Sequence, residues 1–310
     1  DVSVFMPLEH AVLARVVTDR QRTAMFARYS LVGSLLAAAG SLAVALPAML
    51  AGVSGLSMTS AMQAMFLLYA LIAGAAGLVY RGLPKALVTE VRQPMAPLQQ
   101  SKQRVYTLAA LFSLDAFAGG FVVQSMVALW LYQRFGMSLA TAGVVFFWTG
   151  VLSAASYLVA VRIAGRFGLV NTMVFTHIPS SVCLILLPFV PDLGYAIALL
   201  FLRSALSQMD VPTRSSYVMA IVTPAERPAA ASIASVPRSL AAAISPFLAG
   251  WMLGASSFGW PLLVAGGVKI AYDLLLLALF RNIRPPEEDN SPHENTENGV
   301  PVDLPGNRLR

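Results

Sequence analysis

The sequence predicts an all-α integral membrane protein with eight transmembrane helices, and three observations support this fold class. Hydrophobic residues make up 57% of the 310 positions, charged residues make up only 12%, and the mean hydropathy is +0.70. A soluble domain usually has about twice this charged fraction. The apolar residues gather in continuous runs of about 20 positions, the length that a helix needs to cross a bilayer. A β-barrel would show short alternating segments instead.

Eight apolar runs are long enough to span the membrane as helices. They cover residues 24–50, 59–80, 104–132, 139–163, 171–190, 194–211, 229–254 and 259–281. A long polar connection separates two helices from six, and the C-terminal end is rich in Pro, Glu and Asn, which predicts disorder. The chain therefore divides into two helices (1–81), a central loop (82–103), six helices (104–283) and a tail (284–310).

The loops alternate in charge along the chain. One set carries nearly all of the loop arginines and lysines, whereas the opposite set holds Arg134 alone. Since basic residues accumulate in cytoplasmic loops, this asymmetry places both chain ends and the central loop in the cytoplasm. The net charge of +6 then reflects topology, and no nucleic-acid partner is expected. We expect a multi-pass protein of a cell membrane, of the bacterial inner-membrane type.

An internal repeat relates the N-terminal region to a later part of the chain. Residues 7–38 align with 212–243, and the matches include Pro7/Pro212 and Arg22/Arg227. The alternative explanation is the shared Ala- and Ser-rich composition. A true repeat is parallel, because both copies have the same orientation. Three helices precede the second copy within its group, and none precede the first. We therefore expect that the intact protein has two sets of six helices and that this chain lacks the N-terminal ones.

The helix arrangement and one short motif resemble a known family. The arrangement is two sets of helices joined by a long cytoplasmic loop, with both ends inside. The motif is "VRIAGRFG" at 161–168, in which Arg166 and Gly168 fit a loop motif of the major facilitator superfamily, although Gly165 replaces its Asp. The chain thus resembles that superfamily from about the end of its fourth helix through its twelfth. The resemblance implies that spans 104–132 and 194–211 line a central cavity and that 171–190 and 259–281 are peripheral.

Asp115 and Arg203 are the main candidates for contact with a substrate or with protons. Asp115 lies roughly 16 Å along its helix from Arg104, and Arg203 lies roughly 13 Å from Gly194, at 1.5 Å per residue. Both are therefore near the middle of the membrane, where ionisable residues are costly and usually functional. We expect the two charges to meet or to face one site. A purely structural ion pair is the alternative.

Other polar residues receive weaker assignments. Arg238 is a second buried cation, and Gln124 offers hydrogen bonds toward the cavity. Lys269 and Asp273 stand four residues apart, so we expect them to pair with each other at the periphery. The runs "AGG" at 118–120 and 265–267 predict close approach between helices.

A cytoplasmic gate or structural role is expected for a second group of residues. Asp210 and Arg214 fall near the cytoplasmic interface and are one turn apart, which favours a local pair. Pro212 between them lacks a backbone donor and is expected to end the helix. The basic residues assigned to the same side are Arg162, Arg166 and Arg227.

These features favour a secondary active transporter that moves a small solute by alternating access, with proton-coupled efflux. No Walker-type phosphate loop is present, which argues against an ATP-driven pump. Acidic residues and histidines are scattered, so we expect no enzyme activity, no metal and no cofactor. The expected partners are a small-molecule solute, protons and the lipid bilayer. An integral-membrane enzyme and a non-transporting sensor or scaffold with this fold remain the alternatives.

Overall fold

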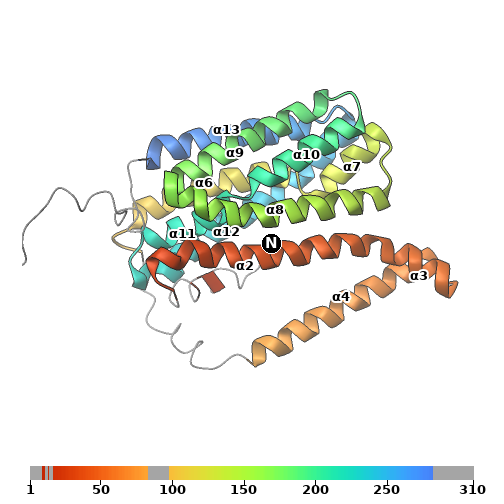
Figure 1. Cartoon of the computed structure of the whole chain (residues 1–310), viewed down its shortest axis with the longest axis horizontal. Helices are drawn as coiled ribbons and strands as arrows, with labels where there is room; N and C mark the ends of the chain where they lie inside the picture. The colour runs from red at the N-terminus through yellow and green to blue at the C-terminus, as the bar shows by residue number, and fades with distance from the viewer. Residues whose placement is uncertain (1–8, 11–12, 14–16, 83–97, 282–310) are drawn as a thin grey trace, which may run out of the picture.

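The computed structural model describes residues 9–10, 13, 17–82 and 98–281, and these parts contain helices without any strand (Figure 1). The expectations for most of the central loop and for the tail fall on residues outside this set. The principal helices are α2 (Asp19–Leu42), α3 (Leu46–Ser54), α4 (Met58–Arg81), α6 (Lys102–Gly120), α7 (Gln124–Phe135), α8 (Leu139–Phe167), α9 (Leu169–Leu186), α10 (Leu193–Ser207), α11 (Asp210–Ala220), α12 (Arg227–Ala255) and α13 (Trp260–Phe280). Short 3₁₀ turns occupy Ala43–Ala45, Leu187–Phe189 and Pro224–Glu226.

Seven stretches of the described residues are long and apolar enough to cross a membrane. They match seven of the eight expected spans, with limits that differ by a few residues. The expected span 104–132 is interrupted, because α6 ends at Gly120 and α7 begins at Gln124. The all-helical membrane fold is confirmed.

The one expected span that is not matched, 194–211, differs from the prediction. Its helix α10 ends at Ser207 after 15 residues, and a second helix, α11, begins at Asp210. Pro212 was expected to end a helix, and this is wrong. It lies in the first turn of α11, where a proline's missing N–H costs nothing because that donor has no partner within the helix.

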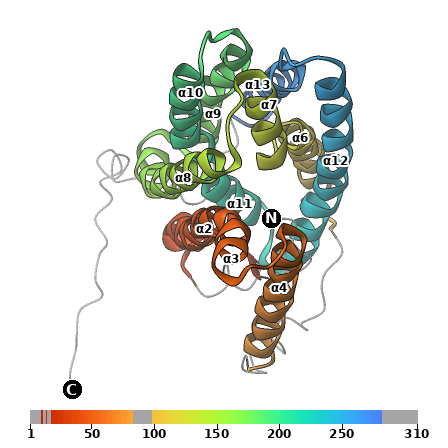
Figure 2. The ribbon, with the colours of Figure 1, turned by 90° about the vertical axis from the view of Figure 1, so that its right-hand side faces the viewer.

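Three long helix pairs hold the bundle together. Helix α12 packs along α6, α13 packs along α9, and α2 packs along α8. Figure 2 shows these helices end-on, with α2 lying beneath α8 and α11. The pair α2 and α8 joins the N-terminal helices to the later ones.

Helix α4 has a different environment. It contacts the rest of the chain mainly through α3, and Ala61 is its only buried residue among those described (Figure 1). Its exposed residues include Phe66, Leu67 and Leu71. A helix that is apolar on all sides suits a lipid or protein environment, not water.

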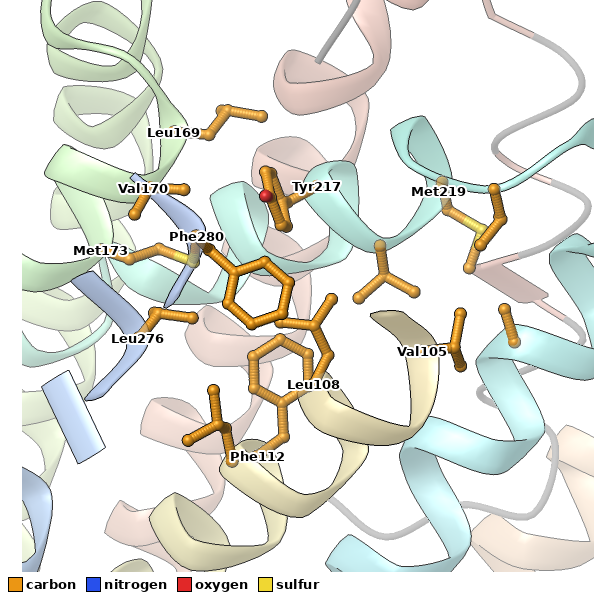
Figure 3. Packing of buried hydrophobic residues seen from close by; sticks show 14 of the residues in the cluster. Val105, Leu108, Phe112, Leu169, Val170, Met173, Tyr217, Met219, Leu276 and Phe280 are labelled. Atoms are coloured by element: carbon orange, nitrogen blue, oxygen red, sulfur yellow. The ribbon is translucent and has the colours of Figure 1, made fainter. Parts of the chain in front are cut away.

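A hydrophobic cluster fills one end of the bundle, between α6, α9, α11 and α13 (Figure 3). Leu108 and Phe112 of α6 meet Tyr217 of α11 and Phe280 of α13, and the rings of Tyr217 and Phe280 lie 6.2 Å apart in an edge-on arrangement. The cluster fixes the positions of α6, α11 and α13 just below the polar residues described in the next section.

The topology makes a direct prediction for labelling. Single cysteines at exposed Arg134 and Ser257, in a Cys183→Ser background, are expected to react with an impermeant maleimide from outside the cell. Cysteines at exposed Lys102 and Arg166 are expected to react only after permeabilisation, because the excess of basic loop residues predicts that their side is cytoplasmic. Outside labelling at Lys102 would contradict the orientation.

Glu226 ties the start of α6 to the connection between α11 and α12. Its Oε1 accepts hydrogen bonds from the backbone N–H groups of Gln99 and Gln100, at 2.7 and 3.1 Å. These donors stabilise the ionised form and hold the pKa of this carboxyl below its usual value. The stabilisation is therefore present above the usual carboxyl pKa and is lost as the pH falls through the lowered one.

A Glu226→Gln variant tests this contact. We expect its melting temperature at neutral pH to be below that of the wild type, because the amide is a weaker acceptor than the carboxylate. The difference should shrink when the pH is lowered from about 7 to about 3, since the carboxyl of the unfolded chain is protonated first and that of the folded protein follows at its lowered pKa. A difference that is independent of pH would show that the charge of Glu226 does not contribute.

Candidate functional site

Asp115 of α6 is the centre of a buried group of charges. Lys269 of α13 donates from Nζ to one carboxylate oxygen at 2.6 Å, and Arg214 of α11 donates from Nη1 to the other at 2.9 Å. All three side chains are less than a tenth exposed. Two cationic donors on one carboxylate favour its ionised form, so this arrangement compensates the cost of burying the charge.

A histidine–aspartate pair adjoins this centre. His177 of α9 places Nδ1 3.0 Å from both carboxylate oxygens of Asp273 on α13. Its other ring nitrogen, Nε2, lies 3.4 Å from Nζ of Lys269 and 3.9 Å from Oδ1 of Asp115. The imidazole thus lies between the two carboxylates and is hydrogen-bonded to that of Asp273.

Helix α11 contributes a second acidic residue to the group. Asp210 lies 3.3 Å from Arg214, one turn along the helix. The guanidinium of Arg214 also lies over the ring of Phe112, 5.4 Å from its centroid. Arg214 therefore has two acidic partners and an aromatic contact, which hold its side chain in one position.

Two adjoining cavities open beside these charges. The first, of about 310 Å³, is lined by Asp115, His177, Asp210, Arg214, Arg238 and Lys269, together with small and polar residues of α6, α10 and α12. The second, of about 340 Å³, is lined by Arg203, Lys269, Gln124 and several serines of α2, α8 and α10. Lys269, Ser207, Gln208 and Gly119 line both cavities. The second cavity lies between α2 of the first helix group and helices of the second.

The structure does not pair Asp115 with Arg203, which were expected to meet or to face one site. Asp115 takes Lys269 and Arg214 as its partners, whereas Arg203 faces the second cavity. The expected pair of Lys269 with Asp273 is also wrong, because Asp273 bonds to His177. Span 259–281 is therefore not peripheral to the cavity.

The gate assignments have mixed outcomes in geometry. Asp210 and Arg214 do form a local pair, but they are buried beside Asp115 and line the first cavity. Arg162 and Arg166 are exposed at the end of α8, and Nε of Arg227 donates to the carbonyl of Met219 at 3.1 Å. Whether these residues form a gate stays a prediction.

His177, Lys269 and Asp273 belong to the site but were not among the residues predicted for it. A buried histidine and two charges in neighbouring apolar helices are a usable signal, because membrane spans seldom carry unpaired ionisable residues. Lys269 and Asp273 were instead assigned to each other from their spacing. The spacing of four residues made them plausible partners within one helix, whereas in the folded protein each pairs with a residue of another helix.

A multi-pass helical bundle with a buried charge network beside polar cavities is the architecture of a membrane transporter. Residues 108–304 match the family model of the Major Facilitator Superfamily, and the chain belongs to this family.

A relative and a solved structure agree with this membership. An uncharacterised membrane protein of Saccharomyces cerevisiae, YJR124C, is 25% identical over 319 residues, which cover 91% of this chain and 71% of the relative. The crystal structure of the human organic anion transporter MFSD10 aligns with a TM-score of 0.67 at 18% identity, over 87% of this chain and 67% of that one. At this identity the structural match shows a shared fold.

Proposed function

We propose that the protein is a proton-coupled secondary active transporter of a small solute. The observation that carries the proposal is the buried network of Asp115, Lys269, His177 and Asp273 beside the two cavities. Membership of a transporter family supports solute movement and argues against catalysis. Proton coupling needs a group that gains and loses a proton where it affects the solute site, and the network supplies candidates.

The contacts divide the roles within the network. Asp115 is held by two cations, so its protonation requires that Lys269 or Arg214 first move away. The pair of His177 and Asp273 accepts a proton without breaking those bonds. A protonated His177 places a positive charge beside Lys269, whose Nζ lies 3.4 Å from Nε2. The repulsion between the two cations weakens the bond from Lys269 to Asp115. Protonation and rearrangement of the cavity lining are thereby linked.

Transport in proteoliposomes tests the proposal. The purified protein is reconstituted, a pH gradient is imposed, and accumulation is measured for radiolabelled p-aminohippurate, tetraethylammonium and mannitol, an anion, a cation and a neutral solute. We expect the gradient to drive at least one of them, with the protein oriented for export, and a protonophore to abolish the accumulation. Downhill movement that ignores the gradient would contradict proton coupling.

Variants assign the coupling to the network. His177→Gln and Asp273→Asn are expected to abolish accumulation against a gradient while leaving downhill exchange, because they remove the proton-accepting pair and keep the cavity. Arg134→Gln, at an exposed position on α7, is the matched control and should behave as the wild type. Full gradient-driven accumulation by His177→Gln would remove this pair from the mechanism.

A further inference from the structure

We propose that the second cavity binds an anionic group of the transported solute, a carboxylate, sulfonate or phosphate, through Arg203, Ser207 and Lys269. This inference rests on the proposed function and adds to it the class of substrate and the residues that recognise it. Three observations carry it: the charge of the cavity lining, two unpaired donors on α10, and the position of Lys269.

The lining of the second cavity is positively charged. Arg203 and Lys269 contribute cations, and the described residues that line it include no aspartate or glutamate. Lys269 already shares its charge with Asp115, but Arg203 has no ion pair with any described carboxylate. A cation inside a helical bundle is costly without a counter-charge, so this cavity favours an anion.

Two donors of α10 have no protein partner and belong to the same cavity lining. Nε of Arg203 and Oγ of Ser207 are both buried without a hydrogen bond. The two residues are one turn apart and therefore share one face of the helix. Since buried polar groups are nearly always bonded, two unpaired donors on one face indicate that a ligand or solvent supplies the acceptors.

Two neighbouring hydroxyl groups of the lining already donate to backbone carbonyls. Oγ of Ser34 donates to the carbonyl of Gly150 at 3.1 Å, and Oγ of Ser153 donates to the carbonyl of Ser204 at 3.3 Å. These bonds join α2 to α8 and α8 to α10. Arg203 and Ser207 thus supply buried donors that no described protein group accepts from, and a guanidinium is suited to an oxyanion.

Lys269 connects the anion site with the charge network. It lines both cavities, and in this structure its Nζ is bonded to Asp115. An anion in the second cavity offers Lys269 an alternative partner. The volume of about 340 Å³ is within the range of small-molecule sites, about 300–1,000 Å³, so the cavity has room for more than the charged group alone.

Equilibrium binding to the purified protein tests the inference without any gradient. The probes are p-aminohippurate, naphthalenesulfonate and phenyl phosphate, each compared with an uncharged counterpart: p-aminohippurate methyl ester, naphthalenesulfonamide and phenol. We expect at least one anion to bind at least about tenfold more tightly than its counterpart, since the charged form adds charge-assisted hydrogen bonds. Binding of none of the anions, or equal binding of both members of every pair, would overturn the inference.

Variants locate the site. Arg203→Gln is expected to weaken binding of the anion by about tenfold or more, Ser207→Ala by less, and Arg203→Lys to retain part of the affinity. The exposed Arg134→Gln variant is the control and should bind as the wild type. Thermal melting checks that each variant is folded. If Arg203→Gln does not fold, Ser207→Ala still tests the site. Wild-type affinity in both variants would place the anion elsewhere.

A lipid phosphate has the same chemistry as a soluble anion, so the binding assay is repeated in two kinds of nanodisc. Equal affinity in phosphatidylcholine and phosphatidylglycerol supports a solute site. Competition by phosphatidylglycerol that is lost in Arg203→Gln would assign the cavity to a lipid and overturn the solute assignment. Anion binding with no response to a pH gradient in proteoliposomes would retain the site while contradicting proton coupling, which separates the two proposals.

Discussion

Replacing Lys269 with methionine is expected to destabilise the protein by about 3 kcal/mol, because Asp115 then loses one of its two cationic partners inside the bundle. The bond from Nζ to Oδ1 is 2.6 Å long, and both side chains are less than a tenth exposed. Arg214 remains on the other carboxylate oxygen but is shared with Asp210. Unfolding titrations in mixed micelles, compared with wild type, measure the loss.

The double variant Asp115→Asn with Lys269→Met distinguishes a direct contact from a general effect of charge. We expect it to be more stable than Lys269→Met alone, because the uncompensated carboxylate has been removed together with its partner. The coupling energy between the two positions should be about 1–3 kcal/mol. Arg134→Met, which removes an exposed cation, is the control for charge loss. Additive effects at Asp115 and Lys269 would mean that the pair is not formed.

The fold was largely predictable because the bilayer restricts what an apolar run can do. A segment of about 20 apolar residues must be helical when lipid offers no partners to its backbone. The interruptions were not predictable in the same way. Helix α6 ends at Gly120 although the apolar run continues past it, and α10 ends at Ser207 although the predicted span extended to residue 211. Where a helix breaks depends on packing against its neighbours, which a hydropathy pattern does not contain.

The lining of the cavities was predictable in part, but the partners of the charges were not. Counting residues along a helix predicted that Asp115 and Arg203 lie near the middle of the membrane, and both line cavities. Depth says nothing about the direction in which a side chain points around the helix axis. The break after Ser207 also starts a new helix at Asp210, and Arg214 reaches Asp115 from this helix. Arg203, the cation expected at the depth of Asp115, is therefore not its partner.

Substituting Gly266 and Gly267 separately is expected to give opposite changes in stability. Both lie in the "AGG" run of α13, but only Gly266 faces α9. A Cβ atom on Gly266 would lie 2.8 Å from the backbone carbonyl oxygen of Ser181 and 2.5 Å from Cγ1 of Ile185. The side chain of Ile185 can turn away, but the carbonyl of Ser181 cannot move without shifting α9. Gly266→Ala is therefore expected to cost about 1–3 kcal/mol, as overpacking of a tight contact does.

Gly267→Ala is the matched control, because a Cβ atom at that position meets nothing within 4 Å. The added methyl group restricts the unfolded chain and favours the helix, so we expect a gain of up to about 1 kcal/mol. The same unfolding titrations compare the two variants, which differ by one position and by no atom in composition. Equal effects would mean that α13 and α9 do not approach closely at Gly266. A loss confined to Gly266→Ala would show that this glycine sets the spacing between α13 and α9, and with it the positions of Lys269 and His177 in the charge network.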